Sequence, residues 1–443
     1  MANVLVIGKG GREHALVWKL KQSENVDRVY CIPGSDGIAE IANCADYNVN
    51  DFNGIAEFCK EMNIDLVVPG PEDPLCEGIV DYLTERGIKT SGPSKAAARL
   101  EGSKAFAKEF MRKHNIPTAD FEVFMDPDKA KDYVEAHGAP IVIKADGLAA
   151  GKGSKVCMTL DEAINAVDSI LVKKEFKDAG NKIVIEDYLE GEEASILALT
   201  DGNTIRTLAP AGDYKPAFET KHDRTRWLQS GGDRKYEDRK IGPNTGSLGA
   251  YAPTPIVTPE LMEKVYNRIL NPTIKGMAEE GTLFVGCLYA GLMIKDGEPS
   301  VLEDNVRFGD PETQPILSLL ESDLFLLLNA CVEGNLERHQ IKNREGAACC
   351  VVMASGSYPG SNYEKGKVIS GLEEVKRLSD VYVFHAGTKK NNGRIETDGG
   401  RVLGVNGNGD NIWQAINTVY PAVSLIHWEN EYHRTDIAEK ALS

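Results

Sequence analysis

Three polar side chains near residue 305 have the types and the spacing needed for phosphate chemistry. Glu303, Asn305 and Arg307 occupy alternate positions, so on a β-strand they would point to one face. A carboxylate and an amide oxygen can hold a hard cation such as Mg²⁺, while a guanidinium can clamp a phosphoryl or acyl-phosphate oxygen. The turn-forming residues at 309–311 place the trio at a strand end. The pattern indicates an enzyme that uses ATP; an edge strand with a solvated polar face is the alternative.

A glycine-rich segment, KADGLAAGKG, lies between two apolar strand-like segments and is expected to form a hairpin turn. Its glycines leave the backbone free to close over phosphates, which Lys144 and Lys152 could neutralise. A Walker loop is excluded because Lys152 precedes a glycine instead of Ser or Thr, and because a strand follows instead of a helix. A turn without a ligand is the alternative. The glycines are Gly147, Gly151 and Gly153.

The segment GKGGREHA joins the first apolar strand to the first helix. Its backbone amides could bind an anion at the helix N-terminus, and Arg12 adds positive charge. The dinucleotide fingerprint fails because Glu13 replaces its last glycine, and because Pro33 and Gly34 end the second strand where a ribose-binding acid is expected. A sugar phosphate therefore fits better than NAD, with a tight structural turn as the alternative.

Two further polar segments could complete a nucleotide and substrate site. One, IVIEDYLEGEEAS, carries Glu186 and Glu193, whose carboxylates could accept hydrogen bonds from the adenine amino group and the ribose hydroxyls. The other, GPNTGSLGAYAP, is a glycine-rich loop in which Asn244 and Thr245 offer hydrogen bonds to a small polar substrate. A solvated acidic turn and a structural loop are the respective alternatives.

Short apolar strands alternate with amphipathic helices along the chain, which is typical of α/β proteins. The strand and helix units of the first hundred or so residues predict a doubly wound parallel sheet, and one long amphipathic helix is expected over SKAAARLEGSKAFAKEFMRKH. A length of 443 residues is too great for one core. We expect three domains, at residues 1–102, 103–330 and 331–443, with a smaller unit at 117–190 inside the second.

Composition excludes several classes of protein. A net charge of -17 disfavours a nucleic-acid partner. No apolar run approaches the roughly 20 residues of a membrane span, and the N-terminus enters a strand without a signal peptide, so a cytoplasmic protein is expected. The nine cysteines include no CxxC pair, which favours reduced and mostly buried thiols over disulfides or zinc ligands.

Taken together, these segments resemble the ATP-grasp superfamily and, more closely, the phosphoribosylamine–glycine ligase family. The resemblance implies an α/β fold, α+β overall. A doubly wound, Rossmann-like pre-ATP-grasp domain at 1–102 would precede an ATP-grasp core at 103–330, which includes an ATP lid at 117–190, and a C-terminal domain would follow at 331–443. The motifs run nearly end to end in one order: GGREHALVWKL, PGPEDPL, SGPSKAAARLEGSKAFAKEFM, KADGLAAGKG, IEDYLEGEEAS, GPNTG, RFGDPETQ and GGRVLGV.

The reaction that the resemblance implies joins glycine to 5-phosphoribosylamine through a glycyl phosphate. It uses ATP with Mg²⁺ or Mn²⁺, and it gives glycinamide ribonucleotide, ADP and phosphate in purine biosynthesis. The implied partners are these small molecules, with no nucleic acid and no membrane, and a monomer is expected. A paralogous ATP-grasp amide ligase with another amino acid or amine is the alternative.

The resemblance also assigns roles to residues. Arg307 and Lys144 would act in catalysis, and Glu303 and Asn305 would bind the metal ion. Many ATP-grasp enzymes have a further acidic ligand about one strand earlier, and Gly291 lies near that place here. ATP would be bound by Lys104, Lys144, Gly147, Gly151, Gly153, Glu186, Leu189 and Glu193. The other substrates would be bound by Gly11, Arg12, Glu13, Glu72, Asp213, Asn244, Thr245 and Arg307.

One region departs from the family pattern. Family members usually carry QDHK and, soon after, an acidic pair before TGPNTGGMG, whereas this chain has Tyr214 in place of the histidine and IGPNTGSLG in place of the last motif. An insertion of uncertain register lies between Asp213 and Gly242. It is either a solvated surface loop or a cover over a substrate of different shape. The covering residues would be Arg224, Arg226 or Trp227.

Overall fold

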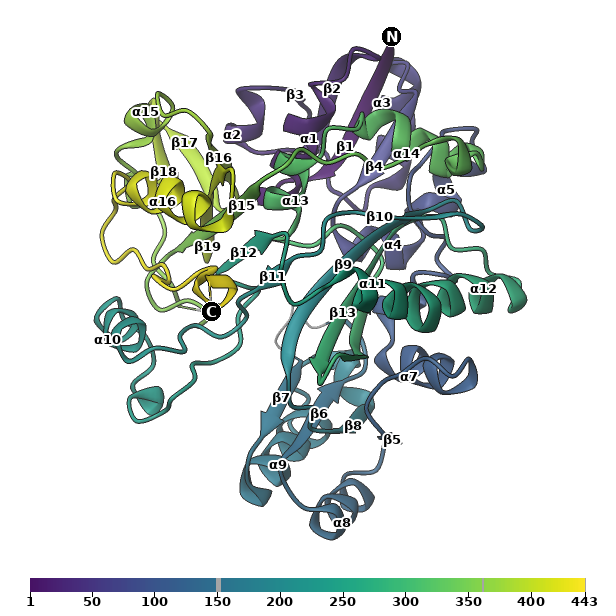
Figure 1. Ribbon diagram of the computed structural model, residues 1–443, viewed down its shortest axis with the longest axis vertical. Helices are drawn as coiled ribbons and strands as arrows, with labels where there is room; N and C mark the ends of the chain where they lie inside the picture. The colour runs from purple at the N-terminus through teal and green to yellow at the C-terminus, as the bar shows by residue number, and fades with distance from the viewer. Residues whose placement is uncertain (149–152, 361, 443) are drawn as a thin grey trace.

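The computed structural model describes residues 1–148, 153–360 and 362–442 (Figure 1). They form four sheets of four or five strands and one two-stranded ribbon. The mixture of helices and strands agrees with the expected α/β class. Gly151, one of the glycines expected to bind phosphate, and Lys152 lie outside the described residues.

The N-terminal residues form a parallel sheet flanked by helices. Its elements are β1 (Ala2–Gly8), α1 (Gly11–Leu20), β2 (Val26–Pro33), α2 (Asp36–Ala39), β3 (Asn43–Cys44), α3 (Phe52–Glu61), β4 (Leu66–Pro69), α4 (Glu72–Glu77) and α5 (Ile79–Thr84). The strand order is β3-β2-β1-β4, with all pairs parallel. Alternate β1 residues enter two different cores, Leu5 and Ile7 one of them and Val4 and Val6 the other. Burial on both faces explains why this strand is a continuous apolar run.

The expectation of one long helix before residue 114 was wrong. Two helices occupy this stretch, α6 (Arg99–Gly102) and α7 (Lys104–Lys113). Between them Ser103 has an extended backbone, and its Oγ accepts a hydrogen bond from Phe106 N at 3.2 Å. A serine N-cap starts a new helix, and a single interruption of this kind does not disturb the apolar periodicity of the sequence. The break places Lys104 in the first turn of α7.

The next unit is a four-stranded antiparallel sheet with its own apolar core. It lies at the end of the molecule opposite the N-terminal sheet (Figure 1). Its elements are β5 (Phe121–Phe124), α8 (Pro127–His137), β6 (Ile141–Ala145), β7 (Ser154–Cys157), α9 (Leu160–Val167), the π-helical turn Asp168–Val172, the 3₁₀ turn Lys177–Asn181 and β8 (Ile183–Asp187). β6 and β7 pair antiparallel, with Lys144 opposite Ser154, so KADGLAAGKG connects a hairpin as the sequence predicted.

A central antiparallel sheet carries the polar trio at one end. Its strands are β9 (Glu192–Thr200), β10 (Ile205–Thr207), β13 (Gly286–Lys295) and β14 (Glu298–Asn305), in the order β10-β9-β13-β14. Because β14 ends at Asn305, Arg307 lies beyond the strand, and the expectation of three residues on one strand was wrong for Arg307. The helical segments after β10 and β14 are α11 (Pro259–Val265), Tyr266–Leu270, α12 (Asn271–Glu279), α13 (Thr313–Leu319), α14 (Leu324–Glu333) and Leu336–Arg338.

The C-terminal sheet has the order β11-β12-β15-β19-β16. It takes β11 and β12 from residues before 330, so this sheet extends across the expected boundary, and the domain limits stay a prediction. The strands are β11 (Gly212–Asp213), β12 (Gly249–Ala252), β15 (Ala347–Ala354), β16 (Val381–His385) and β19 (Arg401–Gly409), with a ribbon of β17 (Thr388–Asn391) and β18 (Arg394–Thr397). The helical segments are α10 (Lys221–Gln229), Arg234–Tyr236, α15 (Leu372–Val375), α16 (Ile412–Val423) and Glu439–Leu442.

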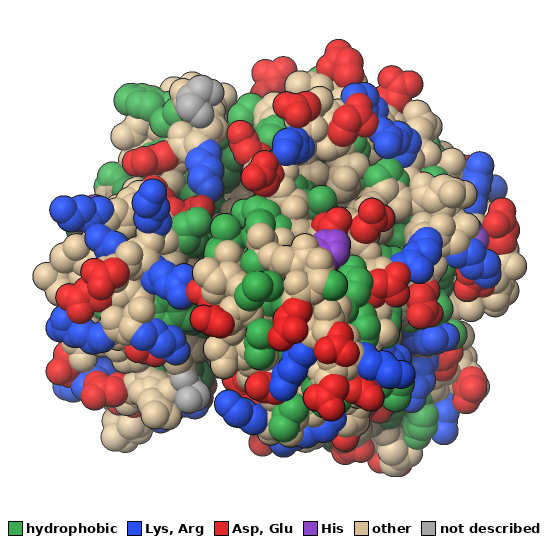
Figure 2. Space-filling model, turned by 90° about the horizontal axis from the view of Figure 1, so that it is seen from below, with side chains coloured by type: hydrophobic (Ala, Val, Ile, Leu, Met, Phe, Trp, Pro, Cys, Tyr) green, Lys and Arg blue, Asp and Glu red, His purple; other side chains and the backbone are tan. Residues whose placement is uncertain are grey.

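The surface carries charges of both signs, and the cysteines are free and mostly buried thiols. Lys and Arg side chains are interspersed with Asp and Glu over the face shown in Figure 2. All nine cysteines are free thiols, and all but Cys44 and Cys76 are buried. Among the described helices, none combines the length and the apolar character needed to cross a membrane.

A pair of buried histidines joins the N-terminal and C-terminal sheets. His14 on α1 accepts a hydrogen bond at Nδ1 from the backbone N–H of His385 on β16, at 2.9 Å. Burial lowers the pKa of His14 to about 3 and that of His385 to about 4. An acceptor Nδ1 requires that His14 be neutral unless its hydrogen bond breaks. The contact between the two sheets is therefore sensitive to acid.

We expect this contact to weaken below pH 6.5, the ordinary pKa of histidine. Because the folded pKa values are depressed, stability is fully present above pH 6.5 and is lost as the pH falls toward 4. At pH 5 each histidine would lower the free energy of unfolding by roughly 2 kcal/mol. Urea unfolding at pH 7.5 and 5.0 measures how much free energy of unfolding is lost between these pH values. The loss should be smaller in His14→Asn than in the wild type, because the asparagine does not titrate and its amide oxygen can still accept the hydrogen bond. Exposed His222→Asn is the control, and equal losses in all three proteins would contradict the prediction.

Candidate active site

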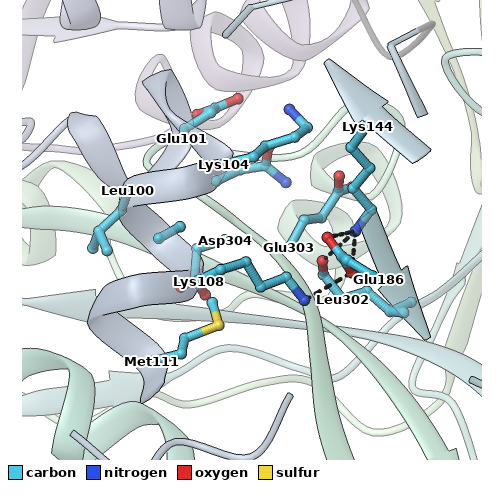
Figure 3. Close-up of a pocket in the computed structure, with 12 residues that line it drawn as sticks. Leu100, Glu101, Lys104, Lys108, Met111, Lys144, Glu186, Leu302, Glu303 and Asp304 are labelled. Carbon is cyan, nitrogen blue, oxygen red and sulfur yellow. Dashed lines mark hydrogen bonds and ion pairs between the residues drawn. The ribbon is translucent and has the colours of Figure 1, made fainter. Parts of the chain in front are cut away.

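A small pocket lies among α7, β6, β8 and β14, where lysines and carboxylates converge (Figure 3). Lys144 Nζ donates to Glu186 Oε2 and to the carbonyl oxygen of Leu302, each at 2.9 Å. Lys108 Nζ lies 2.8 Å from the same Glu186 oxygen. Burial opposes the ionisation of Glu186, but Lys144 and Lys108 hold its pKa below the usual value. Two ammonium groups therefore share one buried carboxylate.

The hairpin after β6 is fixed to the start of α7. Asp146 Oδ1 accepts hydrogen bonds from Ser103 Oγ at 2.9 Å and from Ala105 N at 3.0 Å. Lys104 Nζ donates to the carbonyl oxygen of Gly147 at 3.5 Å. These contacts bring together Lys104 and Gly147, which the sequence analysis expected to bind phosphate, beside Lys144.

Gly147 and Gly153, two of the glycines expected to bind phosphate, have different roles in the hairpin. Gly147 has φ +136°, and a Cβ there would lie 2.9 Å from the Cβ of Ala179. The carbonyl oxygen of Gly153 accepts a hydrogen bond from Ala145 N at 2.8 Å and so closes the hairpin. Any side chain at 147 would therefore collide with Ala179, and a positive φ at this position favours glycine.

Glu303 and Asn305 offer oxygen ligands at the end of β14. Lys215 lies 3.4 Å from Glu303 Oε1 and lowers the pKa of Glu303 to about 2, so the carboxylate is ionised. Gly291 stands opposite Glu303 in the β13–β14 register, where it supplies no third acidic ligand. Nowhere in the described part of the chain do three His, Cys, Asp or Glu side chains gather in a way that could hold a metal ion. One carboxylate and one amide suit a hard divalent cation that keeps waters and phosphate oxygens as its other ligands.

Lys215 organises the region between the metal-ligand candidates and the expected ribose contact. Its Nζ also lies 3.2 Å from Glu193 Oε2, at the start of β9. Thr245 donates from both Oγ1 and N to the carbonyl oxygen of Lys215, at 2.7 and 2.8 Å. Burial raises the pKa of Asp213 to about 8 against the opposing effect of Lys215. Asn244 is exposed. Thr245 therefore positions Lys215 and has its hydroxyl hydrogen in use.

Arg307 is held by two carboxylates from the N-terminal part of the chain. Its Nε lies 3.2 Å from Glu72 Oε2, and its Nη2 lies 2.9 Å from Glu101 Oε1. Arg12 Nη1 lies 3.8 Å from the same Glu72 oxygen. Burial opposes the ionisation of Glu72, yet Arg307 and Arg12 lower its pKa to about 2. Arg12, Glu72 and Arg307, expected from three separate motifs, thus form one ionic network.

Glu13 is engaged within the protein. Its carboxylate accepts hydrogen bonds from Gly10 N and from Arg12 Nε, both at 2.6 Å. The acid therefore satisfies an amide at the start of α1, where the sequence suggested that a bound anion could sit. A Cβ at Gly11 would lie 2.9 Å from Gln314 Nε2. These contacts are those of a tight turn, and the substrate-binding roles of Gly11 and Glu13 stay predictions.

The sequence reasoning assigned no site role to Lys108, Glu101 or Lys215. Lys108 follows Lys104 by four residues, so the two share a helix face, and this spacing was a usable signal. Lys215 ends the GDYK segment, at the place of the lysine in the family motif QDHK, and this match was a usable signal. The partnership of Glu101 with Arg307 joins residues far apart in the chain and had no local signal. Leu189, an expected ATP contact, is half-buried between β8 and β9.

The GGRVLGV motif supplies a further charged contact near the trio. Arg401 Nη2 lies 2.8 Å from Asp310 Oδ2, and Arg401 Nη1 donates to the carbonyl oxygen of Asp310 at 2.7 Å. Arg401 also donates to the carbonyl oxygen of Gly246, in the GPNTG segment. The C-terminal sheet thereby fixes both the turn after Arg307 and the loop that holds Lys215.

The segment between Asp213 and Gly242 is partly buried against the C-terminal region, while residues 237–241 are exposed. Trp227 on α10 is 1% exposed, and its Nε1 donates to the carbonyl oxygen of Tyr358 at 2.7 Å. Arg226 donates to the carbonyl oxygen of His433 at 2.8 Å, and Arg224 to that of Arg239 at 2.8 Å. The three proposed covering residues therefore contact the C-terminal region or their own segment. α10 lies apart from the sheet of β5, β6, β7 and β8, here called the lid sheet, in Figure 1. Arg239, later in the same segment, pairs with Glu162 on α9 beside that sheet, at 2.6 Å.

Replacing Trp227 tests whether the segment is structural. Trp227→Ala should lower the free energy of unfolding by roughly 3–5 kcal/mol, because it empties a buried aromatic site. The Michaelis constant for glycine should stay unchanged in the folded protein. Trp413→Ala, at a position that is 61% exposed, is the matched control and should change neither quantity. A raised Michaelis constant for glycine in Trp227→Ala, without loss of stability, would support the hypothesis that the segment covers a substrate.

Three regions of the chain match domains of one family. Residues 2–101, 102–313 and 348–440 match the N domain, the ATP-grasp (A) domain and the C domain of phosphoribosylglycinamide synthetase. The phosphoribosylamine–glycine ligase of Rhodopirellula baltica is 46% identical over 447 residues, which cover 99% of this chain and 98% of that protein. The phosphoribosylamine–glycine ligase of Nostoc sp. is 48% identical over 445 residues, which cover 99% of this chain and 100% of that protein.

Solved structures show the same architecture. The crystal structure of phosphoribosylamine–glycine ligase from Thermotoga maritima superposes with a TM-score of 0.80 at 31% identity, over 98% of this chain and 99% of that one. A biotin carboxylase domain from Hydrogenobacter thermophilus has a TM-score of 0.71 at 16% identity, over 99% of this chain and 97% of that one, and shows a shared fold. The chain belongs to the phosphoribosylglycinamide synthetase family, also named phosphoribosylamine–glycine ligase, and has the ATP-grasp fold expected from its sequence.

Proposed function

We propose that the protein is an ATP-dependent ligase that joins glycine to 5-phosphoribosylamine and releases glycinamide ribonucleotide, ADP and phosphate. Family membership supports the choice of substrates. The observation that carries the proposal is the meeting of lysines, oxygen ligands and an arginine network at the ends of β6 and β14. These groups match a reaction in which negative charge must be held while a phosphoryl group is transferred.

In the first step, a carboxylate oxygen of glycine attacks the γ-phosphorus of ATP, and ADP leaves with the bridging oxygen. Lys104 and Lys144 would hold the phosphates from two sides, with the backbone at Gly147 close to them. Glu303 and Asn305 would hold a divalent cation, which we propose to be Mg²⁺ or Mn²⁺ and which when bound supplies charge neutralisation to phosphate oxygens. The product is glycyl phosphate, an activated acyl group.

In the second step, the amine of phosphoribosylamine attacks the carbonyl carbon of glycyl phosphate. The carbon–nitrogen bond forms, inorganic phosphate leaves, and the amine loses a proton. Arg307 would steady the acyl phosphate, and its network reaches Arg12, which would hold the ribose phosphate end together with Glu72. Because Glu72 contacts both arginines, one network would position the two reacting molecules against each other.

The remaining contacts divide between the nucleotide and the acceptor. Because the Glu186 carboxylate is engaged by lysines, we propose that adenine is held mainly by the backbone near Glu186 and Leu189, and ribose by Glu193. Asp213, Asn244 and Thr245 would line the side of the site where Lys215 lies, nearest glycine and the amine. Gly11 and Glu13 would shape the turn that carries Arg12. The monomeric state and the cytoplasmic location stay predictions.

Release of ADP tests the reaction and the placement of the ATP site. Wild-type protein should release ADP only when glycine, phosphoribosylamine, ATP and a divalent cation are all present. Lys144→Ala or Glu303→Ala should slow release by roughly a hundredfold or more while far-ultraviolet circular dichroism stays unchanged. Glu303→Ala should also weaken binding of Mn²⁺, followed by electron paramagnetic resonance.

Lys113→Ala is the control, because Lys113 is an exposed lysine paired with Glu280 at 2.7 Å, outside the pocket. Its rate of ADP release should equal that of the wild type. Wild-type turnover in Lys144→Ala or Glu303→Ala would show that the ATP site is elsewhere. Release of ADP with another amine, but not with phosphoribosylamine, would favour a paralogous ligase.

A further inference from the structure

Lys108 is a buried lysine to which the proposed reaction gives no role. It lies one helical turn after Lys104 on α7 and is 3% exposed. Its Nζ lies 2.8 Å from Glu186 Oε2 and donates to Thr118 Oγ1 at 2.6 Å. Thr118 Oγ1 in turn donates to the carbonyl oxygen of Val301 at 2.6 Å. Lys108 lines the pocket together with Lys144, but its ammonium group is already engaged by Glu186 and Thr118.

The partner of Lys108 is also the partner of Lys144. Figure 3 shows Lys108 and Lys144 reaching Glu186 from different elements, α7 and β6, with Glu186 on β8 between them. Glu186 carries one negative charge and each lysine one positive charge, so the three groups together keep one net positive charge. Without Lys108, Lys144 and Glu186 would form a self-neutralised buried pair. Such a pair would attract phosphates far less, because attraction in a desolvated site depends on net charge.

Two buried ammonium groups close together repel each other, which costs free energy in the empty protein. Burial and the neighbouring Lys144 lower the pKa of Lys108 to about 8. Charge arrangements that disfavour the empty protein are typical of sites built for a ligand of opposite charge. The pocket beside them is lined by Lys104, Glu303 and Asn305, the groups proposed to meet ATP phosphates and metal.

We propose that Lys108 is a positioning residue for nucleotide phosphates. It neutralises Glu186, and thereby leaves the charge of Lys144 available to the phosphates without touching them itself. This inference rests on the nucleotide site of the proposed function. It adds that Glu186 and Lys108 act as a matched pair, in which neither is effective without the other.

The test measures binding of ATP, ADP and adenosine by isothermal titration calorimetry, without a divalent cation. Lys108→Met should weaken ATP binding by roughly tenfold to a hundredfold and ADP binding by less, while adenosine binding stays unchanged. Lys108→Gln, which removes the charge but keeps polar contacts, should behave in the same way. The double variant Lys108→Met/Glu186→Gln restores one net positive charge, so it should bind ATP within about threefold of the wild type.

Lys113→Met is the matched control, since it removes one positive charge from the same helix at an exposed position. It should bind all three ligands as the wild type does. Asp304, the other carboxyl group near Lys108, is kept in every variant. Thermal unfolding identifies any variant that fails to fold, and Lys108→Gln then replaces Lys108→Met.

Three results would overturn the inference. The first is wild-type ATP binding in both Lys108 variants, and the second is an equal loss for adenosine and ATP, which a purely structural role predicts. The third is a double variant that binds ATP no better than Lys108→Met. Since the binding test uses nucleotides alone, its failure is distinct from a failure of ligation, which is measured as ADP release with glycine and phosphoribosylamine.

Discussion

Cations held beside carboxylates, several of them buried, are the constraint on which the rest of this structure depends. The chain has a net charge of -17, yet its reaction gathers several phosphate groups in one site. Positive charge must therefore be concentrated locally, and an unpaired buried cation would be costly. Four of the cationic groups contact carboxylates: Lys144 and Lys108 share Glu186, Lys215 contacts Glu303 and Glu193, and Arg307 contacts Glu72 and Glu101.

The charged groups of the site come from three separate units of the fold. Glu186 and Lys144 belong to the lid sheet, Glu303 belongs to the central sheet, and Glu72 starts a helix of the N-terminal unit. Two apolar cores run from the N-terminal sheet into the central sheet, which fixes the Arg307 network. The lid sheet has its own core, so its lysines approach the central sheet through polar contacts.

The sequence predicted which side chains form the site better than it predicted which residues pair with them. Alternation identified Glu303 and Asn305 because both lie on β14, but it could not show that the strand ends before Arg307. Glycine content identified the hairpin at Gly147, since a positive φ there requires glycine. Local patterns carry no information on contacts such as Glu101 with Arg307, which join segments about 200 residues apart. Such partners are fixed by packing of the sheets, and they become visible only in three dimensions.

Two residues that depart from the family motifs, Tyr214 and Ser247, also have partners that the sequence does not reveal. Tyr214 replaces a histidine, but its side chain is buried in the C-terminal core, away from Lys215. Ser247 replaces a glycine at φ +74°, and its hydroxyl accepts a hydrogen bond from Tyr214 N and donates one to the carbonyl oxygen of Gly249. These contacts offset backbone strain that a glycine would avoid. The change at 214 is thus accommodated in the C-terminal core and the one at 247 by hydrogen bonds, and Thr245 still holds Lys215 beside Glu303. A motif can thus lose residues of its pattern and keep the one contact that places its lysine in the site.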